Sequence, residues 1–277
     1  MKLNNIFTKV HKWRKPIGWF LLLYLLLGWI FYANQDRFIF RARVIQTNET
    51  LKINSPHQEL SIPIDQKDTL QLVLFKTSRT PARGVVLYFH GNRENVEWYA
   101  PQADLFTQEG YEVMMMDYPG YGKSRGERSE SKIYQWATWV YQLARKKYEP
   151  KQIILYGKSL GTGVASYLAS KKDCNQLILE TPYSNFPAVF SHYMPIYPFK
   201  TLLHYQFPTE QYLQKVDVLK IFQAENGLSE DGRIGRATAY ALSRTNHDRW
   251  LSVMAVIEKM KWKPIIDDTL FYANIPA

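Results

Sequence analysis

Cysteine is almost absent from this sequence: Cys174 is the only one among 277 residues. A single thiol excludes an intramolecular disulfide framework and any metal site built from several cysteines. Its surroundings, Lys-Lys-Asp-Cys-Asn before a strand pattern, are typical of a loop. We therefore interpret Cys174 as a structural residue rather than a thiol nucleophile, and we expect neither a metal nor a cofactor.

Acidic residues are also scarce, with 25 Asp and Glu against 35 Lys and Arg, which gives a formal net charge of +10. Such a basic chain suits nucleic acid, anionic lipid or an acidic cell-wall polymer as a partner. The sequence contains no nucleic-acid-binding motif and no run of Lys and Arg with interleaved aromatic residues. We expect no nucleic-acid partner and favour a basic surface near a membrane.

Charge is missing altogether from residues 17–33, whereas residues 1–15 carry five basic residues and no acidic one. At about 1.5 Å per helical residue this run is just long enough to cross a hydrocarbon core of about 30 Å. It is long and bulky for a cleaved signal peptide, and no A-x-A-like site follows it. We predict a single-pass signal anchor, with residues 1–34 forming a cytoplasmic basic stub and the span, and the remaining chain extracytoplasmic. Arg37, Arg41 and Arg43 weaken this charge bias.

Strand and helix patterns alternate through the following part of the chain. Strands are predicted over residues 59–64, 70–74, 84–89, 111–117, 152–156 and 176–180, and helices over residues 96–110, 131–148 and 161–170. The first two strands alternate enough to form an antiparallel pair, whereas the later apolar runs are typical of central strands covered on both faces. This order predicts an α/β fold with a doubly wound, mainly parallel sheet, whose site lies at the carboxyl ends of the strands.

The strongest local motif is Gly157-Lys158-Ser159-Leu160-Gly161, between a predicted strand and a predicted helix. A serine in this position, with a glycine two residues away on each side, is the pattern of a nucleophile elbow. The Leu160 N–H then points to where an oxyanion would form. The alternative is a turn that serves packing alone.

Two other segments fall at the same edge of the predicted sheet. In His90-Gly91-Asn92, we interpret His90 as a histidine packed under the strand end, and the Asn92 backbone N–H as a second oxyanion donor. Residues 182–208, rich in Phe, Tyr and Pro, form either a cap over the site or a long loop packed on the core.

Four segments, FHGN, DYPGYGKSRG, YGKSLGTG and LETPYSN, in this order and spacing, resemble the α/β-hydrolase superfamily, and most of all its membrane-anchored serine-hydrolase branch. The resemblance covers residues 35–218. It implies Ser159 as the nucleophile, Leu160 and Asn92 as oxyanion donors, and hydrolysis of a small acyl ester or thioester without a metal. Membrane lipid is the partner implied by the anchor.

The resemblance stops where this family would supply its acid and base. There a His-Gly-x-x-Asp-like segment follows the next strand and a histidine lies near the end, but neither pattern follows residue 218. Residues 219–277 resemble the second half of a peptidoglycan-binding repeat, followed by the linker helix and first strand of an L,D-transpeptidase. Peptidoglycan is therefore a further candidate partner. The alternative is an amphipathic helix pair packed on the sheet.

Three histidines follow Ser159. We expect His192 and His204 to be surface or packing residues. His247 belongs to the segment that departs from the hydrolase pattern, and we expect it to reach the site only by chance. Asp248 is interpreted as a charge at a helix start and Asp217 as misplaced for a triad acid.

The resulting expectation is a membrane-anchored α/β-hydrolase, truncated before its last strands, with a helical C-terminal segment. It is a carboxylesterase- or thioesterase-like serine hydrolase, impaired because its acid and histidine are missing. Loss of two strands predicts marginal stability. Two alternatives stay open: an active hydrolase whose base is His247, and a non-catalytic protein that joins membrane to cell wall through residues 219–277.

Overall fold

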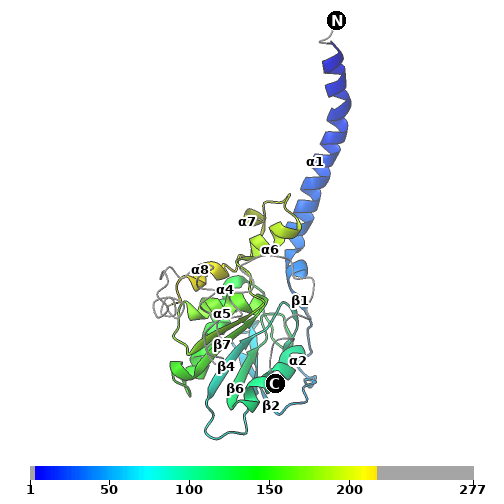
Figure 1. Ribbon diagram of the computed structural model, residues 1–277. Helices are drawn as coiled ribbons and strands as arrows, with labels where there is room; N and C mark the ends of the chain where they lie inside the picture. Colours follow the sequence, from blue (N-terminus) through cyan, green and yellow to red (C-terminus); the bar gives the residue numbers. More distant parts are fainter. Residues whose placement is uncertain (1–3, 217–277) are drawn as a thin grey trace, which may run out of the picture.

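The computed structural model describes the backbone of residues 4–216 and the side chains of residues 15–216. A long helix projects from a domain built around one sheet (Figure 1). That helix, α1, runs from Asn4 to Ile39, and its part from Lys15 to Ile39 is long and apolar enough to cross a membrane. This agrees with the predicted single-pass anchor.

Six strands form the main sheet in the order β2-β3-β6-β4-β7-β8. They are β2 (His57–Pro63), β3 (Thr69–Phe75), β4 (Gly84–Phe89), β6 (Tyr111–Met116), β7 (Ile153–Lys158) and β8 (Gln176–Glu180). β3 pairs antiparallel with β2 and with β6, and the other neighbours are parallel. The predicted α/β class, the antiparallel opening pair and the mainly parallel sheet are confirmed.

The central strands are covered on both faces, as their unbroken apolar sequences predict. In β4, Val85, Leu87 and Phe89 face a core shared with α4 (Glu130–Arg145) and α5 (Leu160–Ala169). Val86 and Tyr88 face a second core, shared with α2 (Val96–Tyr99) and α3 (Ala103–Gln108). Since side chains alternate along a strand, two apolar layers require an apolar residue at every position.

The helix expected over residues 96–110 is two helices instead, α2 and α3, joined by the 3₁₀ turn Ala100–Gln102. Pro101 lies in that turn, and a proline has no N–H for a helical hydrogen bond. The apolar pattern continues through the break because Val96, Ala100 and Ala103 still face one core. The pattern alone therefore did not reveal the interruption.

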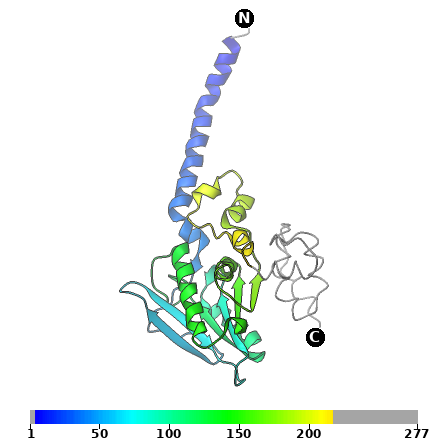
Figure 2. The ribbon, with the colours of Figure 1, turned by 90° about the vertical axis from the view of Figure 1, so that its left-hand side faces the viewer.

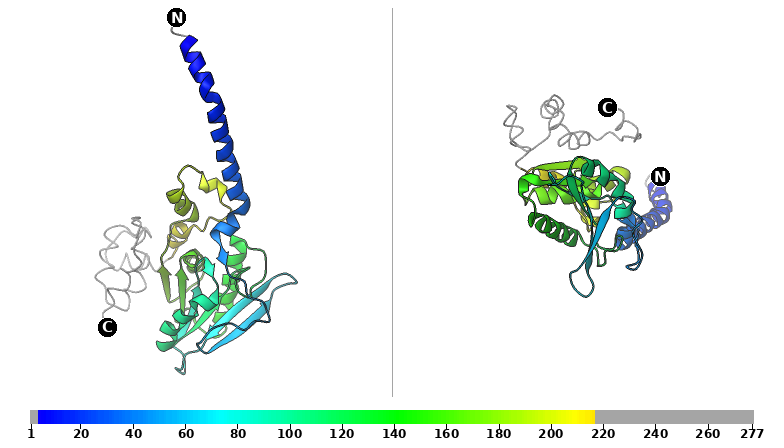
Figure 3. Two further views of the ribbon diagram at one scale, coloured as in Figure 1. Left: turned by 90° about the vertical axis from the view of Figure 1, so that its right-hand side faces the viewer. Right: turned by 90° about the horizontal axis from the view of Figure 1, so that it is seen from below.

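Shorter elements complete the described chain. They are β1 (Arg41–Ala42), β5 (Arg93–Glu94), a 3₁₀ turn at Pro150–Gln152, α6 (Phe186–Tyr193), α7 (Phe199–Leu202) and α8 (Thr209–Leu213). β1 and β5 form a separate two-stranded parallel sheet. Views from two further sides show α6 and α7 beside the half of α1 nearer the domain (Figures 2 and 3).

Candidate active site

Ser159 lies in a sharp turn between β7 and α5, as the motif predicts. Its φ of +50° and ψ of −114° fall in a region that residues other than glycine rarely adopt. Hydrogen bonds hold the turn on both sides: the Ser159 N–H donates to the Glu180 carbonyl at 2.8 Å, and the Thr162 hydroxyl donates to the Ser159 carbonyl at 2.6 Å. These hydrogen bonds hold Ser159 in its strained conformation.

Both glycines of the motif are required by close backbone approach. A Cβ at Gly161 would overlap the carbonyl oxygen of Phe89, and a Cβ at Gly157 would overlap the backbone of Gly161. A Cβ at Gly161 would also lie 2.9 Å from the His90 carbonyl oxygen. The turn around Ser159 and the loop after β4 are therefore packed directly against each other.

Leu160 and Asn92, the two predicted oxyanion donors, occupy these adjoining segments. Leu160 is the first residue of α5 and is buried. A first-turn N–H has no acceptor within its own helix, so it is available to a ligand. Asn92 directly follows Gly91, which lies near the Lys158 carbonyl. The structure thus brings together the segments that carry Ser159, Leu160 and Asn92.

The loop that carries Asn92 is tied to the end of α1. The Asn92 side-chain amide donates to the Ile39 carbonyl at 2.8 Å, and the Arg41 N–H donates to the Asn92 carbonyl at 2.8 Å. The next two residues form β5, which pairs with β1. The Tyr121 hydroxyl also donates to the Asn92 carbonyl, at 2.9 Å. Sequence reasoning did not find this tether, because the partners are about 50 residues apart.

His90 is fully buried, which confirms its interpretation as a packing residue. Its Nε2 lies 3.3 Å from Asp117 Oδ1, and its Nδ1 lies 2.7 Å from the Gly91 carbonyl oxygen. Its ring packs against the rings of Tyr99 and Tyr118. Burial raises the pKa of the Tyr118 hydroxyl well above its usual value, so this hydroxyl stays protonated and donates to the His90 carbonyl.

An ion pair flanks Ser159 that the sequence analysis did not identify. Lys158 Nζ lies 2.5 Å from Glu180 Oε1, and the Tyr156 hydroxyl donates to the other oxygen of that carboxylate. Lys158 and Glu180 end the neighbouring strands β7 and β8 and are paired in register with each other. The pair fixes the two strand ends between which the serine turn is held.

Residues 182–208 fold into α6 and α7, and their two ends rest on α5. At the first end the Tyr183 hydroxyl donates to the Leu160 carbonyl at 3.2 Å. Near the other end Phe207, like Tyr183, lies within contact distance of a Cβ added at Gly163. The predicted cap segment therefore starts and finishes beside the serine turn. We refer to residues 182–208 as the cap.

The two histidines of the cap lie at the protein surface. His204 is exposed, with its ring against Tyr32 of α1, and its N–H donates to Gln35 at 2.7 Å. His192 is exposed at the end of α6, beside Tyr193. Both agree with the predicted surface or packing roles. The remaining candidates, Asp217, His247 and Asp248, and the whole of residues 219–277 lie outside the described residues.

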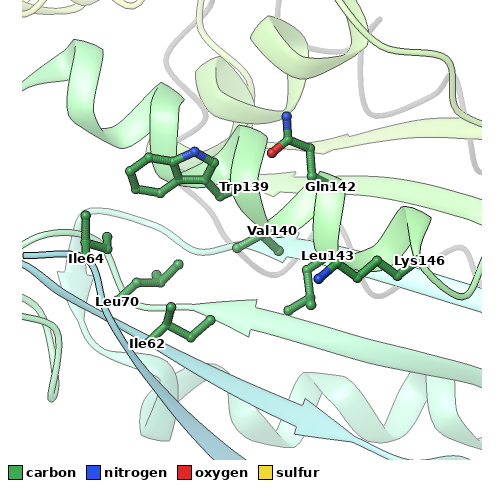
Figure 4. A pocket seen from close by; sticks show the side chains of 8 residues that line it. All are labelled: Ile62, Ile64, Leu70, Trp139, Val140, Gln142, Leu143 and Lys146. Carbon is green, nitrogen blue, oxygen red and sulfur yellow. The ribbon is translucent and has the colours of Figure 1, made fainter.

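A cavity of about 360 Å³ lies elsewhere in the molecule, between α4 and the β2–β3 hairpin (Figure 4). Its lining is mostly apolar: Ile62, Ile64, Leu70, Trp139, Val140, Gln142, Leu143 and Lys146. None of these residues belongs to the serine turn, the Asn92 loop or the cap. Within residues 15–216, no group of three or more His, Cys, Asp or Glu side chains is placed to hold a metal ion.

Comparison with known proteins agrees with this arrangement. Residues 80–226 match the model of a hydrolase family described as serine aminopeptidase, S33. The chain is 34% identical over 123 residues to a lysophosphatidylserine lipase, ABHD12, of Danio rerio, a match that covers 40% of this chain and 31% of the relative. It is 28% identical over 176 residues to protein bem46 of Schizosaccharomyces pombe, covering 61% of this chain and 58% of the relative. The chain thus spans less than two thirds of either relative.

Among solved structures, an α/β-hydrolase from Vibrio vulnificus is similar with a TM-score of 0.50 and 22% identity, over 70% of this chain and 72% of that one. This likeness concerns the fold. The family model covers more than half of the chain and includes the serine turn, the Asn92 loop and the cap. The chain is therefore a member of the hydrolase family described as serine aminopeptidase, S33, and has the α/β-hydrolase fold.

Proposed function

We propose that this chain is a serine hydrolase of acyl esters or thioesters, with Ser159 as its nucleophile. The observation that carries the proposal is the strained turn at Ser159, with a glycine packed against backbone on each side. Strain is expected where a side chain must be presented to a substrate. The lipase among the relatives supports an ester of lipid character as the substrate.

In the proposed reaction, the Ser159 oxygen attacks the carbonyl carbon of the ester. Negative charge develops on the carbonyl oxygen, and the N–H groups of Leu160 and Asn92 stabilise it. The serine proton must pass to a base, and a carboxylate normally orients that base. The acid and histidine motifs that the resemblance implies do not follow residue 218. This supports the further proposal that turnover is impaired.

Labelling of the full chain in membranes with a fluorophosphonate serine probe tests the nucleophile. We expect weak labelling, because the proposed impairment slows attack by the serine, and we expect Ser159→Ala to abolish it. Ser166→Ala is the matched control, because Ser166 lies in α5, the helix that follows the serine turn, and its buried hydroxyl has no hydrogen-bonding partner among the described residues. Equal labelling of the wild type and Ser159→Ala would exclude Ser159 as the nucleophile.

Turnover of a soluble p-nitrophenyl ester tests the impairment. Removal of triad members leaves enzymes of this type with about 10³- to 10⁴-fold acceleration over the uncatalysed reaction, and we expect activity in that range. Full activity that is lost in His247→Ala would contradict the impairment and identify His247 as the base.

We also propose that α1 anchors the protein as a single span, with the hydrolase domain, residues 35–218, outside the cytoplasm. The five basic residues before the span support this orientation. Protease added to sealed inside-out vesicles should leave the domain intact, because an extracytoplasmic domain lies inside them. Digestion of the domain would show that it lies on the cytoplasmic side instead. We do not extend the proposal to peptidoglycan binding, because residues 219–277 lie outside the described part.

A further inference from the structure

The cap contains a long stretch without charge. No Asp, Glu, Lys or Arg occurs between Glu180 and Lys200, and residues 186–199 read FPAVFSHYMPIYPF. At its tip, which we define as residues 193–197, Tyr193 is 74% exposed and Ile196 is 69% exposed. Large apolar side chains are seldom this exposed together on a surface that faces water.

The tip is bound to the apolar part of α1. The rings of Tyr24 and Tyr197 stack with their centroids 4.6 Å apart. The Tyr24 hydroxyl donates to the Ile196 carbonyl at 2.8 Å, and the Tyr197 hydroxyl donates to the Tyr24 carbonyl at 3.0 Å. Gly28 makes room for this ring, since a Cβ there would lie 3.0 Å from it. The tip is therefore fixed on the helix.

The uncharged run of α1 and the uncharged run of the cap end at the same level of the structure. In α1 the uncharged run extends from residue 16 to Gln35, and Asp36 follows it. In the cap Lys200 ends the uncharged run, and two residues later the Leu202 carbonyl accepts a hydrogen bond from the Gln35 side chain. Between this boundary and the tip, Phe31 packs against Phe190 and Phe199. The apolar part of the cap thus lies beside the apolar part of α1.

Helix length sets the depth of the tip. At 1.5 Å per residue, Tyr24 lies about 16 Å from Gln35 along α1 and only about 10 Å from residue 17, where the uncharged bulky run begins. The part of α1 that lies beyond the tip is far shorter than a hydrocarbon core of about 30 Å. If α1 spans the bilayer, the tip must lie inside it.

The backbone of the tip is suited to such a place. Buried peptide groups need internal partners where water is absent. Pro195 within the tip and Pro198 directly after it have no N–H to satisfy. The N–H groups of Met194 and Tyr197 donate to the carbonyls of Phe190 and Met194, respectively. The Ile196 carbonyl accepts the Tyr24 hydroxyl.

From these observations we infer that residues 193–197 are a second membrane-embedded element, inserted among the lipids of the leaflet that faces the hydrolase domain. Their partner is lipid, contacted by the exposed side chains of Tyr193 and Ile196. The inference rests on the proposed anchoring by α1. It gives the cap a direct contact with the bilayer, while the ends of the same segment rest beside Ser159.

A fluorescent depth probe tests the insertion. In a Cys174→Ser background, the full chain carries a single NBD-labelled cysteine and is placed in phosphatidylcholine vesicles. The probe positions are Ile196→Cys at the tip, Leu22→Cys on the exposed side of α1, and Leu105→Cys as the matched control, 66% exposed on α3. Tyr193→Cys is a second tip variant in case Ile196→Cys does not fold.

We expect lipids that carry a nitroxide on the acyl chain to quench the probes at residues 196 and 22, and aqueous iodide to quench only the probe at residue 105. Iodide quenching at residue 196, with lipid quenching retained at residue 22, would overturn the insertion and leave the anchor intact. Iodide quenching at both positions would overturn the insertion and the anchor together. Fluorophosphonate labelling of Ser159 is independent of each outcome.

Discussion

At the scale of single residues, the space around Gly161 determines whether Ser159 keeps its conformation. We expect Gly161→Ala to destabilise the fold by about 1–3 kcal/mol, the usual range for overpacking, since its Cβ would overlap the Phe89 carbonyl. Thermal unfolding measures the effect. Gly18→Ala is the control, with no atom within 4 Å of an added Cβ. Equal unfolding temperatures for both variants would contradict the packing described at Gly161.

Cys174 offers a second test at this scale. Burial raises the pKa of its thiol to about 12, so at pH 8 almost none of it is thiolate, the reactive form. We expect iodoacetamide to modify the folded protein far more slowly than the unfolded protein at the same pH. Equal rates would contradict the raised pKa of the thiol in the folded protein.

The residues of the site were only partly predictable. Ser159, Leu160 and Gly161 belong to one local motif, whose geometry follows from a serine turn between a strand and a helix. The Lys158–Glu180 pair and the bond from Asn92 to Ile39 join distant parts of the chain. Periodicity shows which face of an element is apolar, but it does not show which side chains meet across elements.

At the scale of elements, the pairing of β1 with β5 depends on Asn92. Asn92→Ala removes the bond to the Ile39 carbonyl, and we expect faster hydrogen exchange of the Arg41 and Arg43 amides, which donate to Asn92 and Glu94. Asn34→Ala is the matched control, because the Asn34 amide bonds only within α1, to Ile30. Unchanged exchange in Asn92→Ala would show that the side chain does not hold the two strands together.

Glu112 of β6 bonds to the segments that directly follow α4 and β3. Burial by itself would raise the pKa of this carboxyl, but bonds from Tyr148, Lys147 and Lys76 outweigh it and lower the pKa below 4.5. A carboxyl whose pKa is lower in the folded than in the unfolded state stabilises the fold at pH values above its unfolded-state pKa. This stabilisation is lost as the pH falls through the folded-state pKa. We expect Glu112→Gln to lose stability at pH 7 and to approach the wild type in acid, below about pH 4. Urea unfolding across this range measures it, and a pH-independent difference would contradict the role of charge.

Elements were more predictable than sites. The strands over residues 84–89 and 176–180 agree with β4 and β8 to the residue, since unbroken apolar runs bounded by polar residues define both ends. Helix interruptions were less visible: the apolar face of residues 96–108 continues through the turn at Pro101. The short strands β1 and β5 have no pattern of their own, because two residues are too few to show one.

At the scale of the whole molecule, α1 and the hydrolase domain are not separate parts. Composition predicted a boundary after residue 34, just past the bulky apolar run of residues 17–33, yet α1 continues to Ile39. Gln35 is buried, and its side chain bonds to both the Leu202 carbonyl and the His204 N–H. Composition indicates whether a segment is suited to lipid or to water, but it does not show at which residue the segment begins to contact the rest of the protein.

The β1–β5 pairing therefore affects how this protein would be prepared in soluble form. The usual approach deletes a membrane helix together with the short linker that follows it. Here the residues that a linker would occupy, 40–44, supply β1 and the Arg41 N–H that holds the Asn92 carbonyl. A deletion chosen for solubility would also release the loop that carries Asn92, the proposed oxyanion donor. Loss of activity in such a shortened chain would then reflect damage to the site, not a need for lipid.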